Sequence, residues 1–138
     1  MRKLITAALL TICSMSIAQS RLEEKPPLKR VVNAFDIIKE TEARKEKYGV
    51  FMRIPSISSG VYSLKKGEND DQTPHTKDEI YYIIKGKAKI SIGTETYEVS
   101  EGSLVFVEAF KEHKFFDITS DLSVVVVFSA EQQKPEKK

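Results

Sequence analysis

The sequence lacks most of the motifs that identify common enzyme classes. Its 138 residues include a single cysteine, Cys13, and only two histidines. It contains no glycine-rich phosphate loop and no serine nucleophile motif. These absences exclude P-loop nucleotide chemistry and the serine hydrolase motifs, and they leave the two histidines as the most informative side chains.

The sequence also has no apolar run long enough to span a membrane. Basic residues at Met1–Lys3 precede an apolar run over Leu4–Ile12, and Ser16-Ile17-Ala18 fits a cleavage site with small residues. This pattern predicts a signal peptide over residues 1–18, cleaved after Ala18, and a periplasmic or secreted protein. A lipoprotein anchor at Cys13 ranks lower, because Ile12 stands where a small residue is needed.

Cleavage after Ala18 would remove the only cysteine together with the excess of positive charge. The mature chain would then form no disulfide, and its stability would depend on a hydrophobic core. Arg2 and Lys3 account for the formal net charge of +2. A mature chain without net charge does not favour a nucleic-acid partner.

The remaining chain reads as one domain with a helix followed by strands. Residues 19–30 contain Pro26-Pro27 and predict a flexible lead-in. Residues 31–48 carry apolar side chains at helical spacing, and Gly49 is the expected C-cap. Residues 131–138 form a charged tail that we expect to be disordered.

Short β-prone segments fill residues 49–130. About eight or nine strands are expected here, separated by glycine-rich and polar turns, and no helical pattern lies between them. The fold class is therefore all-β, either a sandwich or a barrel, with a short N-terminal α-helix.

Three side chains in this β region are candidate metal ligands. His75 and Glu79 have the same parity, so an extended backbone directs both to one side. His113 lies on a later predicted strand. If the sheet brings His113 to the other two, the site has two imidazoles and one carboxylate, as in non-haem iron sites. Lys77 shares this parity, and we expect a turn that directs it outward.

The spacing of these residues resembles the two motifs of the cupin family. Gly67, His75, Glu79 and Gly86 follow the first motif, and Gly102, Glu108, Ala109, Phe110, His113 and Asp117 follow the second. Together they cover about residues 60–128. Thr73 stands where the family has another histidine. Glu108, Phe110 and Asp117 stand where it has proline, glycine and asparagine.

The resemblance implies a jelly-roll β-barrel of the cupin type, with His75, Glu79 and His113 together at its lip. The cofactor it implies is one divalent transition metal, and the ligand types suit Fe, Mn, Zn, Ni or Co. Gln72 or a water is a candidate fourth ligand. Asp117 would either orient a ligand or lie on the surface.

Aromatic side chains near the predicted metal site are candidates for the wall of a ligand pocket. Inside a small barrel such residues serve both the core and the pocket, because the pocket is the open end of the core. The predicted pocket residues are Gln72, Tyr62, Tyr81, Phe106 and Phe115. We expect a small-molecule ligand there.

Two segments have apolar residues on both faces of the expected strand, Ile80–Ile84 and Val124–Phe128. An antiparallel sheet normally has one polar face. A helix or a second subunit would cover the additional apolar face, so a homodimer is expected.

Three functions agree with these observations. The first is a metal-dependent enzyme of the non-haem dioxygenase kind, acting on a small organic substrate. The second is a non-catalytic binding module for a small metabolite or sugar, with or without metal. A metal-free isomerase or epimerase ranks last, because the sequence lacks the basic cluster that would bind a nucleotide-sugar.

Overall fold

The computed structural model describes residues 29–133 of the chain. The predicted signal peptide, most of the lead-in and residues 134–138 of the charged tail lie outside this range, whereas Glu131, the first residue of the predicted tail, belongs to the last strand. No helix among the described residues has the length and apolar character needed to cross a membrane.

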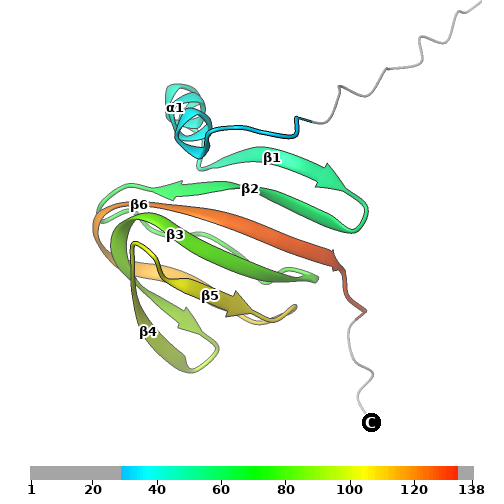
Figure 1. Cartoon of the computed structure of the whole chain (residues 1–138). Coiled ribbons are helices and arrows are strands. Elements are labelled where there is room, and N and C mark those ends of the chain that lie inside the picture. Colours follow the sequence, from blue (N-terminus) through cyan, green and yellow to red (C-terminus); the bar gives the residue numbers. More distant parts are fainter. Residues whose placement is uncertain (1–28, 134–138) are drawn as a thin grey trace, which may run out of the picture.

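One helix precedes six strands, and the strands form a single antiparallel sheet that bends back on itself (Figure 1). The order in the sheet is β1-β2-β6-β3-β4, and β5 pairs with β3. The prediction of an all-β, jelly-roll-like fold is confirmed. The predicted barrel is wrong in one respect, because the sheet does not close. The elements are α1 (Ala34–Arg44), β1 (Tyr48–Ile54), β2 (Ile57–Leu64), β3 (Lys77–Ile92), β4 (Glu95–Ser100), β5 (Leu104–Val107) and β6 (His113–Glu131).

The strands are fewer and longer than the sequence predicts. The segments expected as separate strands before and after Gly86 form one bent strand, β3, and two later segments join in β6. The bend in β3 occurs where the pairing register shifts, between Ile83 and Lys89. A side chain at Gly86 would strike the backbone of Asp121 and Leu122, and the φ angle of Gly86 is +96°. Because glycine tolerates this conformation and this close approach, the strand can bend at Gly86 and continue instead of ending there.

The bends change which residues face inward. In β3 the buried residues are Glu79, Tyr81 and Ile83 before the bend, and Ala88, Ile90 and Ile92 after it. The same change of parity occurs in β6, and there it falls at Asp117, whose φ angle is +46°. The two halves of each long strand thus face one core, which includes Tyr81, Ile83, Ile90, Phe115, Leu122, Val124 and Val126.

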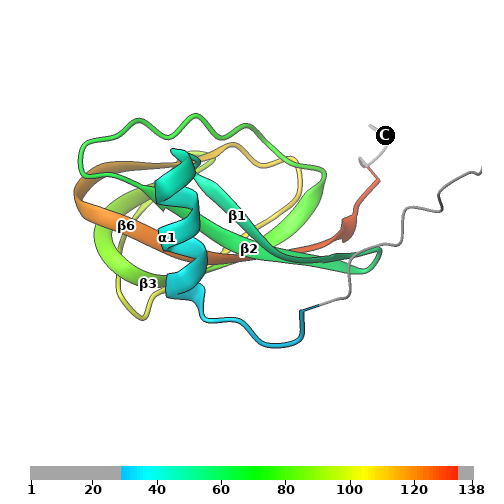
Figure 2. The same ribbon diagram turned by 90° about the horizontal axis from the view of Figure 1, so that it is seen from above.

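The helix is shorter than the predicted segment 31–48. The side chain of Asn33 accepts a hydrogen bond from the Phe35 amide at 2.9 Å and caps the N-terminus. The C-cap is Lys45 in the left-handed conformation, and not Gly49. Gly49 instead lies in β1 directly under the helix, where a Cβ atom would collide with Ile37 and Thr41. As Figure 2 shows, α1 crosses over β1 and β2.

Candidate metal centre

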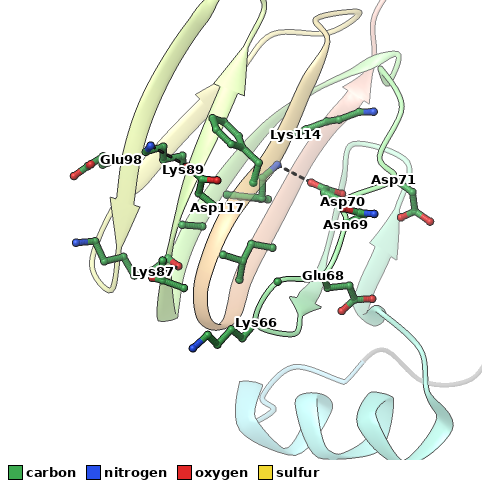
Figure 3. Close-up of a pocket in the computed structure, with 16 residues that line it drawn as sticks. Lys66, Glu68, Asn69, Asp70, Asp71, Lys87, Lys89, Glu98, Lys114 and Asp117 are labelled. Atoms are coloured by element: carbon green, nitrogen blue, oxygen red, sulfur yellow. Dashed lines mark hydrogen bonds and ion pairs between the residues drawn. The ribbon is translucent and has the colours of Figure 1, made fainter.

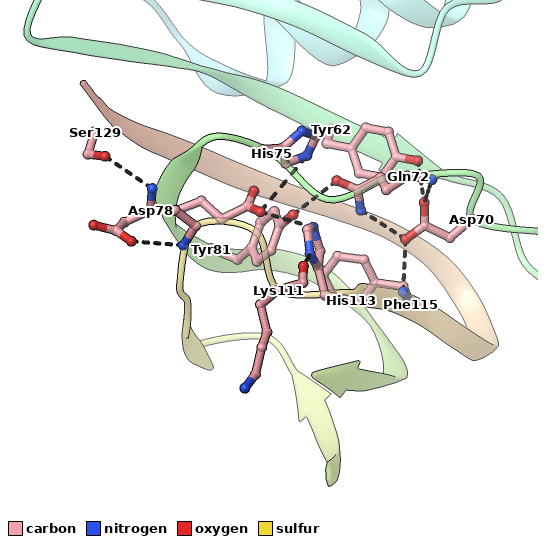
Figure 4. A network of polar contacts seen from close by, with 12 residues as sticks. Tyr62, Asp70, Gln72, His75, Asp78, Tyr81, Lys111, His113, Phe115 and Ser129 are labelled. Carbon is pink, nitrogen blue, oxygen red and sulfur yellow. Dashed lines mark hydrogen bonds and ion pairs between the residues drawn. The ribbon is translucent and has the colours of Figure 1, made fainter. Parts of the chain in front are cut away.

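His75, Glu79 and His113 come together, as the sequence predicts. One ligand atom from each of the three side chains lies within 4.8 Å of the others. His75 belongs to the loop before β3, Glu79 to the start of β3, and His113 is the first residue of β6 (Figure 4). Two imidazoles and one carboxylate therefore face a common point.

The local backbone explains how each ligand reaches this point. Glu79 faces inward because it has the same parity as the buried residues Tyr81 and Ile83. The Phe110 amide donates a hydrogen bond to the His75 carbonyl at 2.6 Å, and this bond joins the loop bearing His75 to the turn before His113. Phe110 adopts a φ angle of +65°, which is strained for a bulky residue. Lys77 is the first residue of β3, and among the described residues it forms no ion pair with Glu79.

The three ligand side chains differ in exposure. The side chains of Glu79 and His113 are each 1% exposed, whereas that of His75 is 32% exposed. Three buried atoms make no well-formed hydrogen bond, namely His75 Nε2, Glu79 Oε2 and His113 Nε2, although His113 Nε2 lies 2.9 Å from Glu79 Oε1. A buried polar atom without a partner costs about 1–3 kcal/mol. Because all three belong to the same cluster, one cation could satisfy them together.

The tautomer of His113 fits metal binding. Its Nδ1 lies 2.8 Å from the Lys111 carbonyl, which can only accept, so Nδ1 carries the proton and donates. Nε2 is then free to act as a metal ligand, and the carbonyl fixes the ring as partners of ligating histidines commonly do.

Without a metal, Glu79 is the nearest partner of both imidazoles. Its Oε1 lies 2.9 Å from His113 Nε2 and 3.9 Å from His75 Nε2. Burial lowers the pKa of His113, but Glu79 and the Lys111 carbonyl outweigh it and hold the pKa above its usual value. A metal-free chain therefore favours a His113–Glu79 ion pair at this point.

The donor set fits a divalent transition metal. Imidazole nitrogens and a carboxylate oxygen suit Fe, Mn, Zn, Ni and Co, and three protein ligands leave further positions open. Gln72, the expected fourth ligand, is otherwise engaged. Its Nε2 donates to Asp70 at 2.9 Å, and its Oε1 accepts from the Tyr81 hydroxyl at 3.0 Å.

The predicted aromatic pocket wall is mostly core. Tyr62, Tyr81 and Phe115 are buried and pack in the hydrophobic cluster. Phe106 is not brought to this site, because its parity in β5 is opposite to that of buried Val107 and leaves it 57% exposed on the outer face. Asp117 likewise points to solvent, where its carboxylate pairs with Lys89 at 2.9 Å.

Two hollows lie near the site. The smaller, of about 280 Å³, is lined mainly by polar residue types, which include His113, Gln72 and Thr73. The larger, of about 1110 Å³, lies beside the second half of β3 and the first half of β6 and is walled by lysines and carboxylates (Figure 3). None of the three candidate ligands lines the larger hollow. Of these two hollows, only the smaller is lined by one of the candidate ligands, His113.

Comparison with known proteins agrees with the fold and the motif spacing. The family model described as the cupin domain matches residues 60–129. The chain belongs to the cupin family. An uncharacterized protein of Streptomyces coelicolor is 44% identical over 90 residues, which are 65% of this chain and 86% of that protein.

Solved cupin structures share the fold at low sequence identity. A Streptococcus pyogenes protein of unknown function is 24% identical, with a TM-score of 0.54 over 65% of this chain and 75% of that one. An RmlC-like cupin from Shewanella frigidimarina is 13% identical, with a TM-score of 0.56 over 62% and 77%. These similarities support the cupin fold and assign no substrate.

Sequence reasoning did not identify Asp70. This carboxylate is only 7% exposed and accepts four hydrogen bonds, although it lies in a polar stretch that resembles an ordinary surface loop. Its partners come from β2, β6 and its own loop, so no local sequence signal could have revealed it.

Proposed function

We propose that this cupin binds one divalent transition metal through His75, Glu79 and His113. The observation that carries the proposal is the convergence of three ligand side chains whose buried atoms make no well-formed hydrogen bond. Native proteins seldom leave such groups unpaired. A cation placed among them would satisfy two imidazoles and offset the charge of a carboxylate.

The three residues have distinct tasks in this proposal. His113 would hold the metal through Nε2, with its ring oriented by the Lys111 carbonyl. Glu79 would bind through one oxygen and balance charge. His75 would complete the set from the more exposed side. When bound, a metal such as Fe(II) in this ligand set supplies redox chemistry and open positions for exogenous ligands.

We propose a dioxygenase-type activity on a small organic substrate as the reaction class. The two-histidine, one-carboxylate set supports it, because that set is typical of non-haem iron oxygenases. The hollow of about 280 Å³ beside His113, lined mainly by polar residue types, suits a small polar molecule better than a large aromatic one. Substrate turnover under oxygen, lost in His113→Ala, would test this reaction class.

One observation favours a binding module instead. Tyr81 and Phe115 fill the interior next to the ligands and are 0% and 1% exposed. The structure thus leaves little apolar space for a substrate beside the metal. If a metal-loaded chain binds a small sugar or metabolite without consuming oxygen, this alternative is correct.

Metal content provides the first test. The chain, purified without chelator and reconstituted with Fe(II), Mn(II) or Zn(II), should contain about one metal per chain by elemental mass spectrometry. His75→Ala and His113→Ala should lose it. Glu112→Gln alters an exposed carboxylate next to His113 and serves as the matched control. A metal-free native protein after reconstitution would contradict the proposal.

We further propose that the cupin forms a homodimer through the outer face of β3, β5 and β6. Ile80 and Tyr82 are 47% and 44% exposed, and they pair across the ladder with Phe106 and Leu104 of β5. On the other side they pair with Val127 and Val125, which are half-buried. Helix α1 covers the same face at β1 and β2 and leaves this part uncovered.

A contiguous apolar patch of this kind is typical of an interaction surface. A second copy would cover it with the same residues, as twofold symmetry requires. Sedimentation analysis should give a dimer at micromolar concentration, and Leu104→Glu with Phe106→Glu should give a monomer. Val50→Glu, at an exposed apolar residue of β1 outside this face, is the control and should leave the dimer intact.

Finally, we propose that the chain is exported and cleaved after Ala18, as the N-terminal pattern suggests. N-terminal sequencing of protein recovered from the cell envelope should begin at Gln19. A chain that starts at Met1 in the cytoplasm would contradict export, and a lipid-modified Cys13 would favour the anchored alternative.

A further inference from the structure

Asp70 lies at the centre of a buried hydrogen-bond network beside the metal ligands (Figure 4). Its Oδ1 accepts from the Tyr62 hydroxyl at 2.8 Å and from the Gln72 backbone amide at 3.1 Å. Its Oδ2 accepts from the Phe115 amide at 2.8 Å and from Gln72 Nε2 at 2.9 Å. The network ties the loop that bears His75 to β2 and β6.

These contacts fix the orientation of the Gln72 side chain. An ionised carboxylate can only accept, so the NH2 group of Gln72 must face Asp70. The amide oxygen must then face the opposite way, where it accepts from the Tyr81 hydroxyl at 3.0 Å. The direction of every hydrogen bond in this chain of three side chains therefore follows from the charge of Asp70.

The Tyr81 hydroxyl has two possible acceptors and only one proton. One acceptor is Gln72 Oε1, and the other is the carboxylate of Glu79, which lies two residues away on the same buried face of β3. Glu79 Oε2 receives no hydrogen bond, which agrees with a proton directed toward Gln72.

We propose that Asp70 and Gln72 are positioning residues that direct the Tyr81 proton away from Glu79 and so keep the Glu79 lone pairs available to the metal. This inference rests on the proposed metal site. If Gln72 is removed or allowed to flip, Tyr81 donates to Glu79 instead. A metal must then break that hydrogen bond before it can bind.

The test is a titration with Co(II) alone, followed by its d–d absorption, on the full mature chain. Asp70→Asn should weaken Co(II) binding about tenfold, the range typical for partners that orient metal ligands. Gln72→Leu should have a similar effect and retains the other three hydrogen bonds of Asp70, so it remains informative if Asp70→Asn fails to fold. Asp71→Asn changes an exposed neighbour that pairs with Lys47 and should bind as the native chain does.

A rescue experiment distinguishes two roles of Gln72, namely orienting the Tyr81 proton and merely supporting the local structure. Tyr81→Phe removes the competing proton. The double variant Gln72→Leu with Tyr81→Phe should therefore bind Co(II) within about threefold of Tyr81→Phe alone, far less than the tenfold loss typical of a missing orienting partner. If the tenfold loss persists in the Tyr81→Phe background, Gln72 acts only as scaffold and the proposal is wrong.

Two further outcomes would also overturn the inference, and they differ in what they leave standing. Native-like Co(II) binding by Gln72→Leu leaves the metal site intact and removes the positioning role. Failure of the native chain to bind Co(II) removes the metal site and this inference together.

Discussion

Glu79 and Asp70 are both buried carboxylates, yet their surroundings differ. Asp70 accepts four hydrogen bonds, and both of its oxygens are satisfied. Glu79 is less exposed still, at 1%, and its Oε2 has no partner. The same fold thus supplies enough donors for one carboxylate and few for the other. The difference indicates that Asp70 serves the fold, whereas Glu79 is left for a partner from outside the chain.

The largest expected effect is the loss of Asp70. Asp70→Ala leaves the Tyr62 hydroxyl and the Phe115 amide without their acceptor in the core. We expect the free energy of unfolding to fall by about 3 kcal/mol or more, because groups that lose a buried charged partner pay their full desolvation cost. Urea denaturation measures this. Asp71→Ala is the control and should leave the midpoint unchanged, and an equal loss in both variants would contradict the assigned role of Asp70.

Metal binding at Glu79 should change the free energy of unfolding by a somewhat smaller amount. A metal at 100 times its dissociation constant stabilises the folded state by about 2.7 kcal/mol. For a domain of this size the melting temperature should rise by about 10 °C, and chelator should reverse the rise. Calorimetry with and without Zn(II) measures it. An equal rise in His113→Ala would show that the metal binds elsewhere.

Alkaline pH should destabilise the chain through Tyr62, whose hydroxyl donates a hydrogen bond to Asp70. Burial and the bond to Asp70 raise the pKa of Tyr62 above its usual value of about 10. The neutral phenol therefore contributes stability that is fully present below about pH 10 and is lost as the pH rises toward the folded-state pKa. Stability should fall by about 1.4 kcal/mol per pH unit for this group. Tyr62→Phe should have a shallower alkaline dependence in urea titrations, and an unchanged slope would contradict the buried bond.

The smallest expected effect is that of Glu79→Gln on the metal-free chain. The substitution removes a buried charge that is incompletely paired, and it supplies an amide NH2 group that can donate to His113 Nε2. We expect the free energy of unfolding to change by less than about 1 kcal/mol, in contrast to Asp70→Ala, because a poorly compensated buried ion adds little stability. The same variant should lose metal binding. A loss of stability as large as that of Asp70→Ala would remove the distinction between the two carboxylates.

The sequence predicts the ligands better than their surroundings. His75, Glu79 and His113 could be identified because strand parity and motif spacing are local properties of the chain. Asp70 and its hydrogen bonds could not, since they join residues up to 45 positions apart. The prediction that Phe106 lines the pocket was wrong for a similar reason. All four residues of β5 are apolar, so the sequence shows no alternation that would tell which side chains face inward.

The departures from the cupin motif have a structural meaning that spacing alone does not reveal. Phe110 and Asp117 stand where the family has glycine and asparagine, and both have positive φ angles, of +65° and +46°. Glycine and asparagine are the residues that tolerate this conformation best. The chain thus keeps the backbone of the motif while changing its side chains, and this explains why the fold survived the substitutions.

The long antiparallel pairing of β3 with β6 also determines when the site can form. Lys77 pairs with Glu131, and Ile92 with His113, so the ladder closes from its near end toward its far end along the sequence. Contacts between residues so distant in sequence form slowly during folding, because the chain must first lose the entropy of the intervening loop. His75 and Glu79 can meet early, but His113 lies at the near end of this ladder and Glu79 at its far end, so the three meet only when the whole ladder has formed. An incoming ion would therefore find all three ligands only on a chain whose folding is well advanced.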